Sequence, residues 1–482
     1  MQDNYVDVLI VGAGISGICA AYYLQNKSPN KTWAILEGRD ELGGTWDLFR
    51  YPGIRSDSDM FTLGYSFRPW TDPDAIANGD KILNYLKETA AENKIDENIH
   101  FGHYVKSAEW SSEEAKWNVE VYQKSTDSLV SYSCNFLFMC SGYYNYDEGY
   151  TPEFKGRDDF EGQIVHPQKW PEDLDYSGKR IVVIGSGATA VTLVPSLAKD
   201  AEHVVMLQRS PTYIVSRPSE DKWANRFRKL FPTKMAYTMT RWKNILYGIW
   251  IYRVSQKRPK IVKQFIMDEI RKTLGDDYDV DTHFNPKYNP WDQRVCLVPD
   301  NDLFDAINQN RASVVTDHIE TFTKKGLKLK SGEELDADII VTATGLNLLF
   351  LGGVELKVDG KIVDSSEVMN YKGVMFSGIP NLALAFGYTN ASWTLKCELA
   401  CGFVTRLLNE MDRSGVKQAT PSPGYEVNEE EFMALSSNYI QRSRDLLPKQ
   451  GDRTPWRLHQ NYILDNLLIR MGKINDGEIQ FR

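Results

Sequence analysis

Short, continuous apolar runs alternate with helical patterns in the first half of the chain. Residues 7–11 (DVLIV) lead through glycines into a helical stretch at residues 18–27 and then into a second apolar run at residues 32–37. Residues 179–184 and 203–208 repeat this succession. Apolar runs of this length on either side of a helix are typical of buried parallel strands in βαβ units. The pattern predicts an α/β protein with two Rossmann-like dinucleotide-binding domains.

Two later apolar runs, residues 135–142 and 336–345, would return the chain from one domain to the other. Helical patterns dominate the residues between the second domain's strands and also the C-terminal third. We therefore expect a first domain built from both ends of the chain, a second domain inserted into it, and a helical insertion within the second domain. The corresponding ranges are 1–145 and 346–482 for the first domain, 146–212 and 291–345 for the second, and 213–290 for the insertion.

The first apolar run ends in GAGISG, with Gly12, Gly14 and Gly17 in the GxGxxG spacing. Gly12 would permit a tight turn, Gly14 would let a pyrophosphate approach the backbone, and Gly17 would let the helix pack on the strand. The helix N-terminus attracts the phosphates. Glu37, at the end of the second run, would bind a free ribose 2′-hydroxyl and repel a 2′-phosphate. The first site is therefore predicted to bind FAD or NAD rather than NADP.

The second fingerprint has Gly185, Gly187 and Ala190 in the same spacing. Its next strand ends at Arg209 and Ser210, where the first domain has an acid. A guanidinium pairs with a phosphate through two parallel hydrogen bonds, so this site is predicted to select NADP(H). Two such sites in one chain predict hydride transfer from NADPH to a bound flavin.

Composition excludes several classes of function. The chain has 482 residues, of which 42% are hydrophobic and 25% charged, as in soluble proteins of more than one domain. A net charge of −9 argues against general nucleic-acid binding. No apolar stretch is long enough to span a membrane, and the first residues lack the basic region of a secretory signal, so a cytoplasmic location is expected. The six cysteines form no CxxC pair and the histidines have no ligand spacing, so no metal site is predicted.

One basic, aromatic-rich segment departs from this acidic balance. Residues 222–267 contain twelve Lys and Arg but no Asp or Glu, together with aromatics such as Trp242 and Trp250. Such a helical stretch can lie on an anionic membrane surface as a peripheral contact. The alternative, which we favour, is that its aromatic side chains pack against the rest of the protein.

A flavoprotein with two dinucleotide sites could be a disulfide reductase, but that chemistry needs two thiols close together near the flavin. Cys134 and Cys140 lie six residues apart in a predicted strand, and Cys397 and Cys401 lie one turn apart on a predicted helix. Neither arrangement resembles a redox pair. The remaining electron acceptor is oxygen.

Residues 160–171 (FEGQIVHPQKWP) have the form FxGxxxHxxxWP, formed by Phe160, Gly162, His166, Trp170 and Pro171. This string resembles the signature of the type I Baeyer–Villiger monooxygenases, which are class B flavoprotein monooxygenases with FAD and NADPH. A second string, GGTWDLFRYPGIRSD, matches the same family and contains Gly44, Trp46 and Asp57. Together with GYTNASWTLK (residues 387–396), these strings look closest to the ethionamide-activating subgroup, which acts on long aliphatic ketones and on thioamides or sulfides.

The resemblance implies roles for individual residues. Arg294 matches the family's active-site arginine, which would favour the anionic C4a-peroxyflavin, and Asp57 would orient it. His166 would serve as a conformational linker rather than as a base. Asn390 and Trp393 would line the flavin or the substrate region. Gln293 stands where many members have a lysine that helps to hold NADP(H), so selectivity could rest more on Arg209 and Ser210.

The expected reaction is oxygen insertion beside a ketone carbonyl, with sulfoxidation as a side activity and a ketone or sulfide and O2 as small-molecule partners. Three alternatives stay open. One is an N- or S-oxygenating flavin monooxygenase, another is an uncoupled NADPH oxidase, and a third is a membrane-associated flavin-binding module. The sequence does not determine the oligomeric state.

Overall fold

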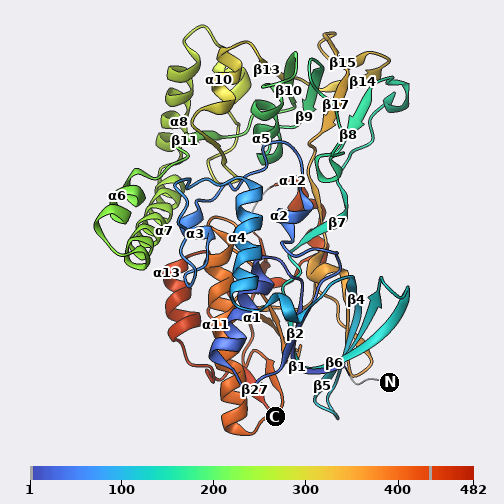
Figure 1. Cartoon of the computed structure of the whole chain (residues 1–482), viewed down its shortest axis with the longest axis vertical. Coiled ribbons are helices and arrows are strands. Elements are labelled where there is room, and N and C mark those ends of the chain that lie inside the picture. The colour runs from blue at the N-terminus through green and yellow to red at the C-terminus, as the bar shows by residue number, and fades with distance from the viewer. Residues whose placement is uncertain (1–3, 434–436) are drawn as a thin grey trace.

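Two sheets with parallel cores lie at opposite ends of the molecule in the computed structural model, which describes residues 4–433 and 437–482 (Figure 1). The lower sheet in Figure 1 is built around the first glycine-rich turn. Its strands are β1 (Asn4–Val11), β2 (Trp33–Leu36), β3 (Ile99–His100), β4 (His103–Ser111), β5 (Lys116–Gln123), β6 (Ser128–Met139), β19 (Glu355–Val358), β20 (Lys361–Ile362) and β23 (Leu382–Leu384). Their order is β20-β19-β4-β5-β6-β1-β2-β3, and β23 also pairs with β6.

The core of this sheet is parallel, as predicted for a Rossmann-like domain. Val8 is paired with Trp33 of β2 on one side and with Phe136 of β6 on the other, both in parallel register. Val8 to Val11 are all buried, as expected for a strand covered on both faces. Helices α1 (Ile15–Lys27), α4 (Gly79–Glu92) and α11 (Trp393–Ser414) cover the sheet, and α1 packs along α11. The antiparallel arm β4-β5-β6 was not predicted.

The upper sheet contains the second fingerprint. Its order is β13-β10-β9-β17-β8, and its neighbouring strands are parallel. The strands are β8 (Gln163–Val165), β9 (Arg180–Ile184), β10 (His203–Gln208), β13 (Ala312–Thr316) and β17 (Ile339–Thr342), with helices α5 (Ala188–Leu197) and α10 (Asp302–Asn308). A small antiparallel sheet, β14 (Ile319–Thr323), β15 (Gly326–Leu329) and β16 (Glu334–Asp336), packs beside it. The mixed α/β fold with two dinucleotide-type domains is thus confirmed.

The expected helical insertion contains α6 (Lys222–Leu230), α7 (Thr233–Lys257), α8 (Pro259–Leu274) and α9 (Val280–Phe284). It begins with a strand instead of a helix, because β11 (Ile214–Arg217) pairs in parallel with β12 (Cys296–Pro299). The prediction that the aromatic side chains of this segment pack inward holds for Tyr237, which is buried. It is wrong for Trp223, Trp242, Tyr247 and Trp250, which are 55%, 42%, 46% and 57% exposed.

The C-terminal third is less helical than predicted. Helix α11 is long, but around it the chain forms the short helices α12 (Asn438–Arg442) and α13 (Tyr462–Asp465) and many short strands. Those outside the large sheets are β18 (Leu346–Leu348), β21 (Asn370–Tyr371), β22 (Met375–Phe376), β24 (Ala419–Pro421), β25 (Glu429–Glu431), β26 (Lys449–Gly451) and β27 (Ile479–Phe481). Outside the C-terminal third, α2 (Thr45–Leu48), α3 (Met60–Leu63) and β7 (Tyr144–Gly149) are also short.

A buried ion pair fixes α7 to the first domain. Arg241 donates to the carboxylate of Glu398 on α11 at 2.9 Å, and both side chains are about 5% exposed. The same guanidinium donates to the carbonyl oxygens of Phe61 (2.9 Å) and Gly64 (2.6 Å) at α3. The second oxygen of Glu398 accepts from the backbone N–H of Ser66 at 2.6 Å. The insertion is therefore held by the first domain, although the chain enters it from the second.

We predict that Arg241→Met destabilises the protein by about 3–5 kcal/mol, because it leaves the Glu398 carboxylate buried without its cation. Lys31→Met is the matched control. It breaks the more exposed pair of Lys31 with Asp412 and should cost no more than about 1 kcal/mol. Thermal unfolding followed by circular dichroism measures both variants, and equal losses would contradict the structural role of Arg241.

Candidate active site

The first glycine-rich turn brings backbone against backbone. A Cβ atom on Gly17 would lie 1.9 Å from the carbonyl oxygen of Gly12, and one on Gly12 would lie 2.7 Å from that of Cys140. Gly12 also has a φ of +102°, which favours glycine. The start of α1 can therefore lie directly at the end of β1, because Gly12 and Gly17 carry no side chains and Gly12 adopts this φ.

Glu37 fastens the same turn. One carboxylate oxygen accepts from the backbone N–H of Ala13 at 2.7 Å and the other from that of Arg39 at 2.9 Å. Burial raises the pKa of Glu37, although these two hydrogen bonds favour its ionised form. Each oxygen keeps a second lone pair, so the carboxylate can hold the turn and still accept from a ribose hydroxyl.

A cavity of about 450 Å³ opens beside this turn and extends to the second domain. Its walls include the amino end of α5, through Ala188 and Thr189, so both fingerprints border one space. The predicted residues that line it are Gly12, Gly14, Glu37, Gly44, Trp46, Asp57, Arg294 and Trp393. The predicted residues that lie outside it are Gly17, Gly185, Gly187, Ala190, Arg209, Ser210, Asn390 and the FxGxxxHxxxWP residues.

Gly44 completes the floor of this cavity. It has a φ of +57°, and a Cβ atom on it would lie 3.1 Å from Cα of Gly14. Two loops distant in sequence thus approach each other through residues without side chains, and they leave backbone exposed to the cavity. Ser141 also borders the cavity, and its buried hydroxyl has no partner within the described structure. A glycine-lined cradle at a helix N-terminus with an unpaired donor fits a phosphate-bearing cofactor such as a flavin dinucleotide.

Arg294 and Asp57 meet inside the cavity, with the guanidinium Nη1 3.6 Å from the carboxylate. Burial opposes the charged form of Arg294, but neighbouring groups such as Asp57 hold its pKa well above the usual range. Arg294 therefore carries a positive charge at every pH at which the protein is folded. Its Nε is buried without a hydrogen-bond partner among the described residues. The site holds a fixed cation with unused donor capacity.

Trp393 forms a wall of the cavity at the start of α11. Its indole N–H donates to the hydroxyl of Ser16 at 2.9 Å, and its ring stacks on Tyr143 at 5.3 Å between centroids. Asn390 lies apart from the cavity and donates instead to the carbonyl oxygen of Gln460 at 3.0 Å. The two residues predicted together from one string thus occupy different places.

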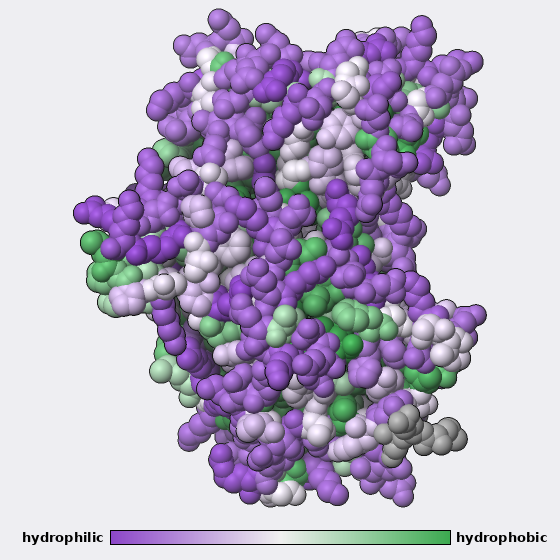
Figure 2. Space-filling model, in the orientation of Figure 1, coloured by the Kyte–Doolittle hydropathy of each residue, from purple (hydrophilic) through white to green (hydrophobic). Residues whose placement is uncertain are grey.

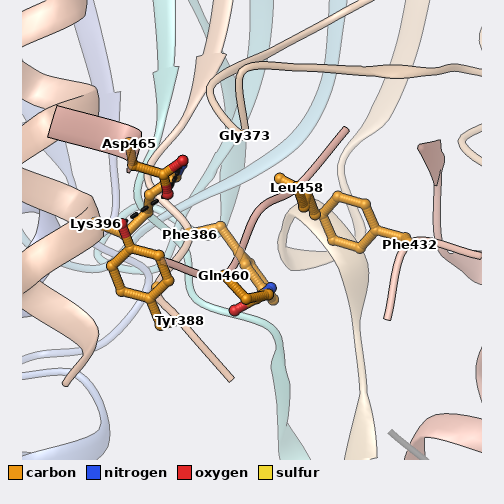
Figure 3. A pocket seen from close by; sticks show the side chains of 9 residues that line it. Gly373, Phe386, Tyr388, Lys396, Phe432, Leu458, Gln460 and Asp465 are labelled. Atoms are coloured by element: carbon orange, nitrogen blue, oxygen red, sulfur yellow. Dashed lines mark hydrogen bonds and ion pairs between the residues drawn. The ribbon is translucent and has the colours of Figure 1, made fainter. Parts of the chain in front are cut away.

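A cluster of polar and charged side chains joins α11 to α13 (Figure 3). Asp465 accepts from the hydroxyl of Tyr388 at 2.7 Å and from the ammonium of Lys396 at 2.8 Å, beside a small cavity of about 10 Å³. Burial lowers the pKa of Lys396, and Asp465 counteracts this shift. The cluster connects α13 to α11 and to the loop that precedes Trp393.

A model of the family described as flavin-binding monooxygenase-like matches residues 6–386. The chain belongs to this family. The FAD-containing monooxygenase EthA of Mycobacterium tuberculosis is 57% identical over 99% of this chain and 98% of its own. The probable FAD-binding monooxygenase AlmA of Acinetobacter baylyi is 48% identical over 100% and 97%. The predicted resemblance to the flavoprotein monooxygenases is thereby confirmed.

Solved structures share the fold at lower identity. An oxidized steroid monooxygenase bound to NADP has a TM-score of 0.79 at 24% identity and covers 99% of both chains. An ε-caprolactone-bound cyclohexanone monooxygenase has a TM-score of 0.76 at 20% identity, covering 99% of this chain and 100% of its own. A complex of OTEMO with FAD and NADP has a TM-score of 0.75 at 20% identity over the full length of both chains.

In this member of the flavin-binding monooxygenase-like family, the second fingerprint is more open than the first. Gly185 has a φ of +139°, and a Cβ atom on it would lie 2.4 Å from the carbonyl oxygen of Ala343. A Cβ atom on Gly187 would meet nothing within 4 Å, so the amino end of α5 faces open space. Ala190 is buried, Arg209 is exposed just after β10, and the Ser210 carbonyl accepts from Ser186 at 3.2 Å.

The FxGxxxHxxxWP residues lie on the second domain near the strands that connect the two domains. His166 is held against Gly149 of β7, and its Nδ1 accepts from the backbone N–H of Gln168 at 3.2 Å. Strand β7 pairs antiparallel with β18, which is the return connection. Burial lowers the pKa of His166. Phe160 packs beside Phe322, and Trp170 packs beside Tyr176. A Cβ atom on Gly162 would lie 2.4 Å from the carbonyl oxygen of Asp338. Pro171 is exposed.

Several cavity residues escaped sequence reasoning. Tyr143, Tyr144 and Tyr146 border the cavity next to Ser141, directly after the predicted return strand. Burial raises the pKa of Tyr146 to about 12, so its hydroxyl stays protonated beside Thr45 at 3.4 Å. The signal was present, because ligands in parallel sheets bind at the carboxyl ends of strands. Metal-binding clusters are absent among the described residues, and every helix there is too short or too polar to span a bilayer.

We predict that Glu37→Ala lowers the free energy of unfolding by about 2–5 kcal/mol, because one buried and one partly buried N–H group lose their acceptor. Glu37→Gln should lose less, since its amide oxygen still accepts one of the two hydrogen bonds. Glu41→Ala is the surface control, because Glu41 and Lys87 form an exposed pair. Chemical denaturation ranks the three variants, and a Glu37→Ala protein as stable as the control would refute this role.

Proposed function

We propose that this protein is an FAD-containing monooxygenase that uses NADPH and O2 to insert one oxygen atom beside a ketone carbonyl. The product is an ester or a lactone, and sulfoxidation is a side activity. The observation that carries the proposal is Arg294, a permanent cation next to Asp57 in a cavity that both fingerprints border. The FAD-containing relatives, and neighbours solved with FAD and NADP, support the choice of cofactors.

The chain has a distinct set of residues for each cofactor. The turn from Gly12 to Gly17 and the N-terminus of α1 would hold the pyrophosphate of FAD, and Glu37 would hold its ribose. Gly187 and the N-terminus of α5 would hold the pyrophosphate of NADP(H), and Arg209 its 2′-phosphate. When bound, the flavin supplies the activated oxygen with electrons from NADPH.

Arg294 would act on the substrate. Negative charge develops on the carbonyl oxygen when the ketone carbon is attacked, and a preorganised guanidinium stabilises this charge more strongly inside a cavity than in water. Asp57 holds the guanidinium in place through their ion pair at 3.6 Å. Its buried Nε supplies a further donor, which no group in residues 4–433 and 437–482 uses.

The aromatic wall would keep water from the reacting atoms. Tyr143 is buried, its ring stacks on Trp393, and its hydroxyl contacts that of Tyr144 at 2.9 Å. Burial raises the pKa of both tyrosines, so neither hydroxyl carries a charge near neutral pH. Near Arg294, the cavity is therefore bounded by neutral aromatic groups beside a cation, which suits an apolar ketone with a single polar end.

We predict that Arg294→Ala retains bound FAD and NADPH oxidation but lowers ester formation by about 10²–10³-fold, the size of effect seen when a charge-stabilising donor is removed. Gas chromatography with mass spectrometry of a medium-chain 2-ketone and an aryl methyl sulfide measures the products. Arg217→Ala is the control, because Arg217 is exposed at the end of β11, away from the cavity.

Ester at the wild-type rate from Arg294→Ala would refute its catalytic role. If the wild-type protein forms sulfoxide but no ester, the protein would instead be assigned to the heteroatom oxygenases. NADPH oxidation without either product would indicate an oxidase. The three outcomes are distinguishable in one reaction mixture.

We predict that Arg209→Glu raises the KM for NADPH by about tenfold or more and improves the relative use of NADH, because the carboxylate repels a 2′-phosphate. FAD content should not change. Lys179→Glu is the matched control, since it makes the same charge change at the opposite end of the sheet, before β9. Equal effects of both variants on the KM would mean that Arg209 does not contact the nucleotide.

A further inference from the structure

One face of the molecule carries apolar side chains that no described part of the chain covers. Figure 2 shows hydrophobic atoms at the left edge, where Figure 1 places α6, α7 and α13. Helix α7 and the segment from α13 to Met471 contribute to this surface, and they touch where the rings of Trp242 and Tyr462 approach to 5.9 Å. We call this surface the outer face.

The exposed residues on α7 follow a helical spacing. Met235, Trp242, Leu246 and Trp250 are 42–57% exposed and lie seven, four and four residues apart, so they form one stripe. The opposite side of α7 is buried through residues such as Tyr237. Exposed apolar residues scattered singly are normal on a protein surface, but a continuous stripe marks a contact site.

The apolar segment continues past α13. Leu464 and Leu467 are 41% and 53% exposed, and Met471 is 74% exposed. Asp465, between them in sequence, points inward to Lys396. This segment therefore buries the carboxylate of Asp465 and presents apolar side chains to solvent beside the exposed cation of Arg470.

Cations border both ends of the stripe. At one end, the exposed Lys229 and Lys234 precede Met235 in sequence. At the other end, the exposed Arg253 and Lys257 follow Trp250. None of these four forms an ion pair within the described residues, and residues 222–267 contain no acid. In a chain with a net charge of −9, this concentration of positive charge is local.

We propose that the outer face docks on the surface of an anionic lipid bilayer and lies in its interface without spanning it. Tryptophan and leucine side chains insert among the upper acyl chains, while Lys and Arg contact the lipid phosphates. The apolar stripe of the outer face thus matches the acyl chains, and its bordering cations match the phosphates. A second copy of this chain fits less well, because a two-fold interface would place two surfaces of the same positive charge against each other.

Flotation of the FAD-loaded protein with vesicles tests the proposal. The protein should float with vesicles of phosphatidylglycerol and phosphatidylcholine and much less with phosphatidylcholine alone. Binding should weaken strongly at about 1 M salt, where the Debye length is about 3 Å. Combined Trp242→Ser, Leu246→Ser and Trp250→Ser should lower the partition coefficient about tenfold or more, because each removes an inserted apolar side chain.

The matched control combines Leu129→Ser and Ile362→Ser, which are 58% and 67% exposed on the antiparallel part of the lower sheet. It should bind vesicles like the wild type. None of the five substituted residues lines the cavity, so NADPH oxidation without vesicles should be unchanged in both variants. That readout separates this proposal from the proposed function.

Three outcomes would overturn the proposal. The wild type could fail to float with anionic vesicles, or the triple variant and the control could bind equally well. In the third outcome, light scattering would show an oligomer that the triple variant dissociates while vesicle binding stays the same. That result would assign the outer face to a second copy of the chain.

Discussion

The arrangement of the site depends on one steric constraint, the contact of backbone with backbone at the first glycine turn. The carbonyl oxygen of Gly12 occupies the space that a side chain on Gly17 would need. This contact places the amino end of α1 directly beside the cavity, with Glu37 fastening the turn from the other side. Gly14 and Gly44 extend the same principle across two loops. The shape of the cavity thus follows from where side chains are missing.

The parts of the fold that local pattern determines could be predicted. Strands β1 and β9, helix α1 and both glycine turns follow from continuous apolar runs and glycine spacing, because a buried parallel strand leaves a clear signal in sequence. Glu37 could be predicted from its place at the end of the fingerprint's second strand, and Asp57 and Arg294 could be paired because strings of the family carry them. The antiparallel arm β4-β5-β6 could not be predicted, since its pairing depends on which strands meet in space. The short strands of the C-terminal third could not be predicted for the same reason.

Long-range contacts explain the other differences. The aromatic residues of α7 have the same helical spacing whether they face a core or solvent, so the sequence could not tell that Tyr237 is buried and Trp250 exposed. Asn390 and Trp393 are neighbours in one string, yet the turn between them directs only Trp393 to the cavity. Tyr143 and Tyr146 were missed because they belong to no sequence motif. Their position directly after a parallel strand was the one signal that could have indicated a place at the site.

The ion pair of Arg241 with Glu398 has a mechanical consequence. The insertion begins and ends in the second domain, where β11 and β12 pair. Its long helix α7 is nevertheless fixed to the first domain by this ion pair. The strands β7 and β18 form a separate connection between the same two bodies. The ion pairs of Arg55 with Asp302 and of Asp57 with Arg294 also join these two bodies, next to the cavity. Opening the cavity would therefore break these two pairs first, because they are less buried than the pair of Arg241 with Glu398, which would keep α7 with the first domain.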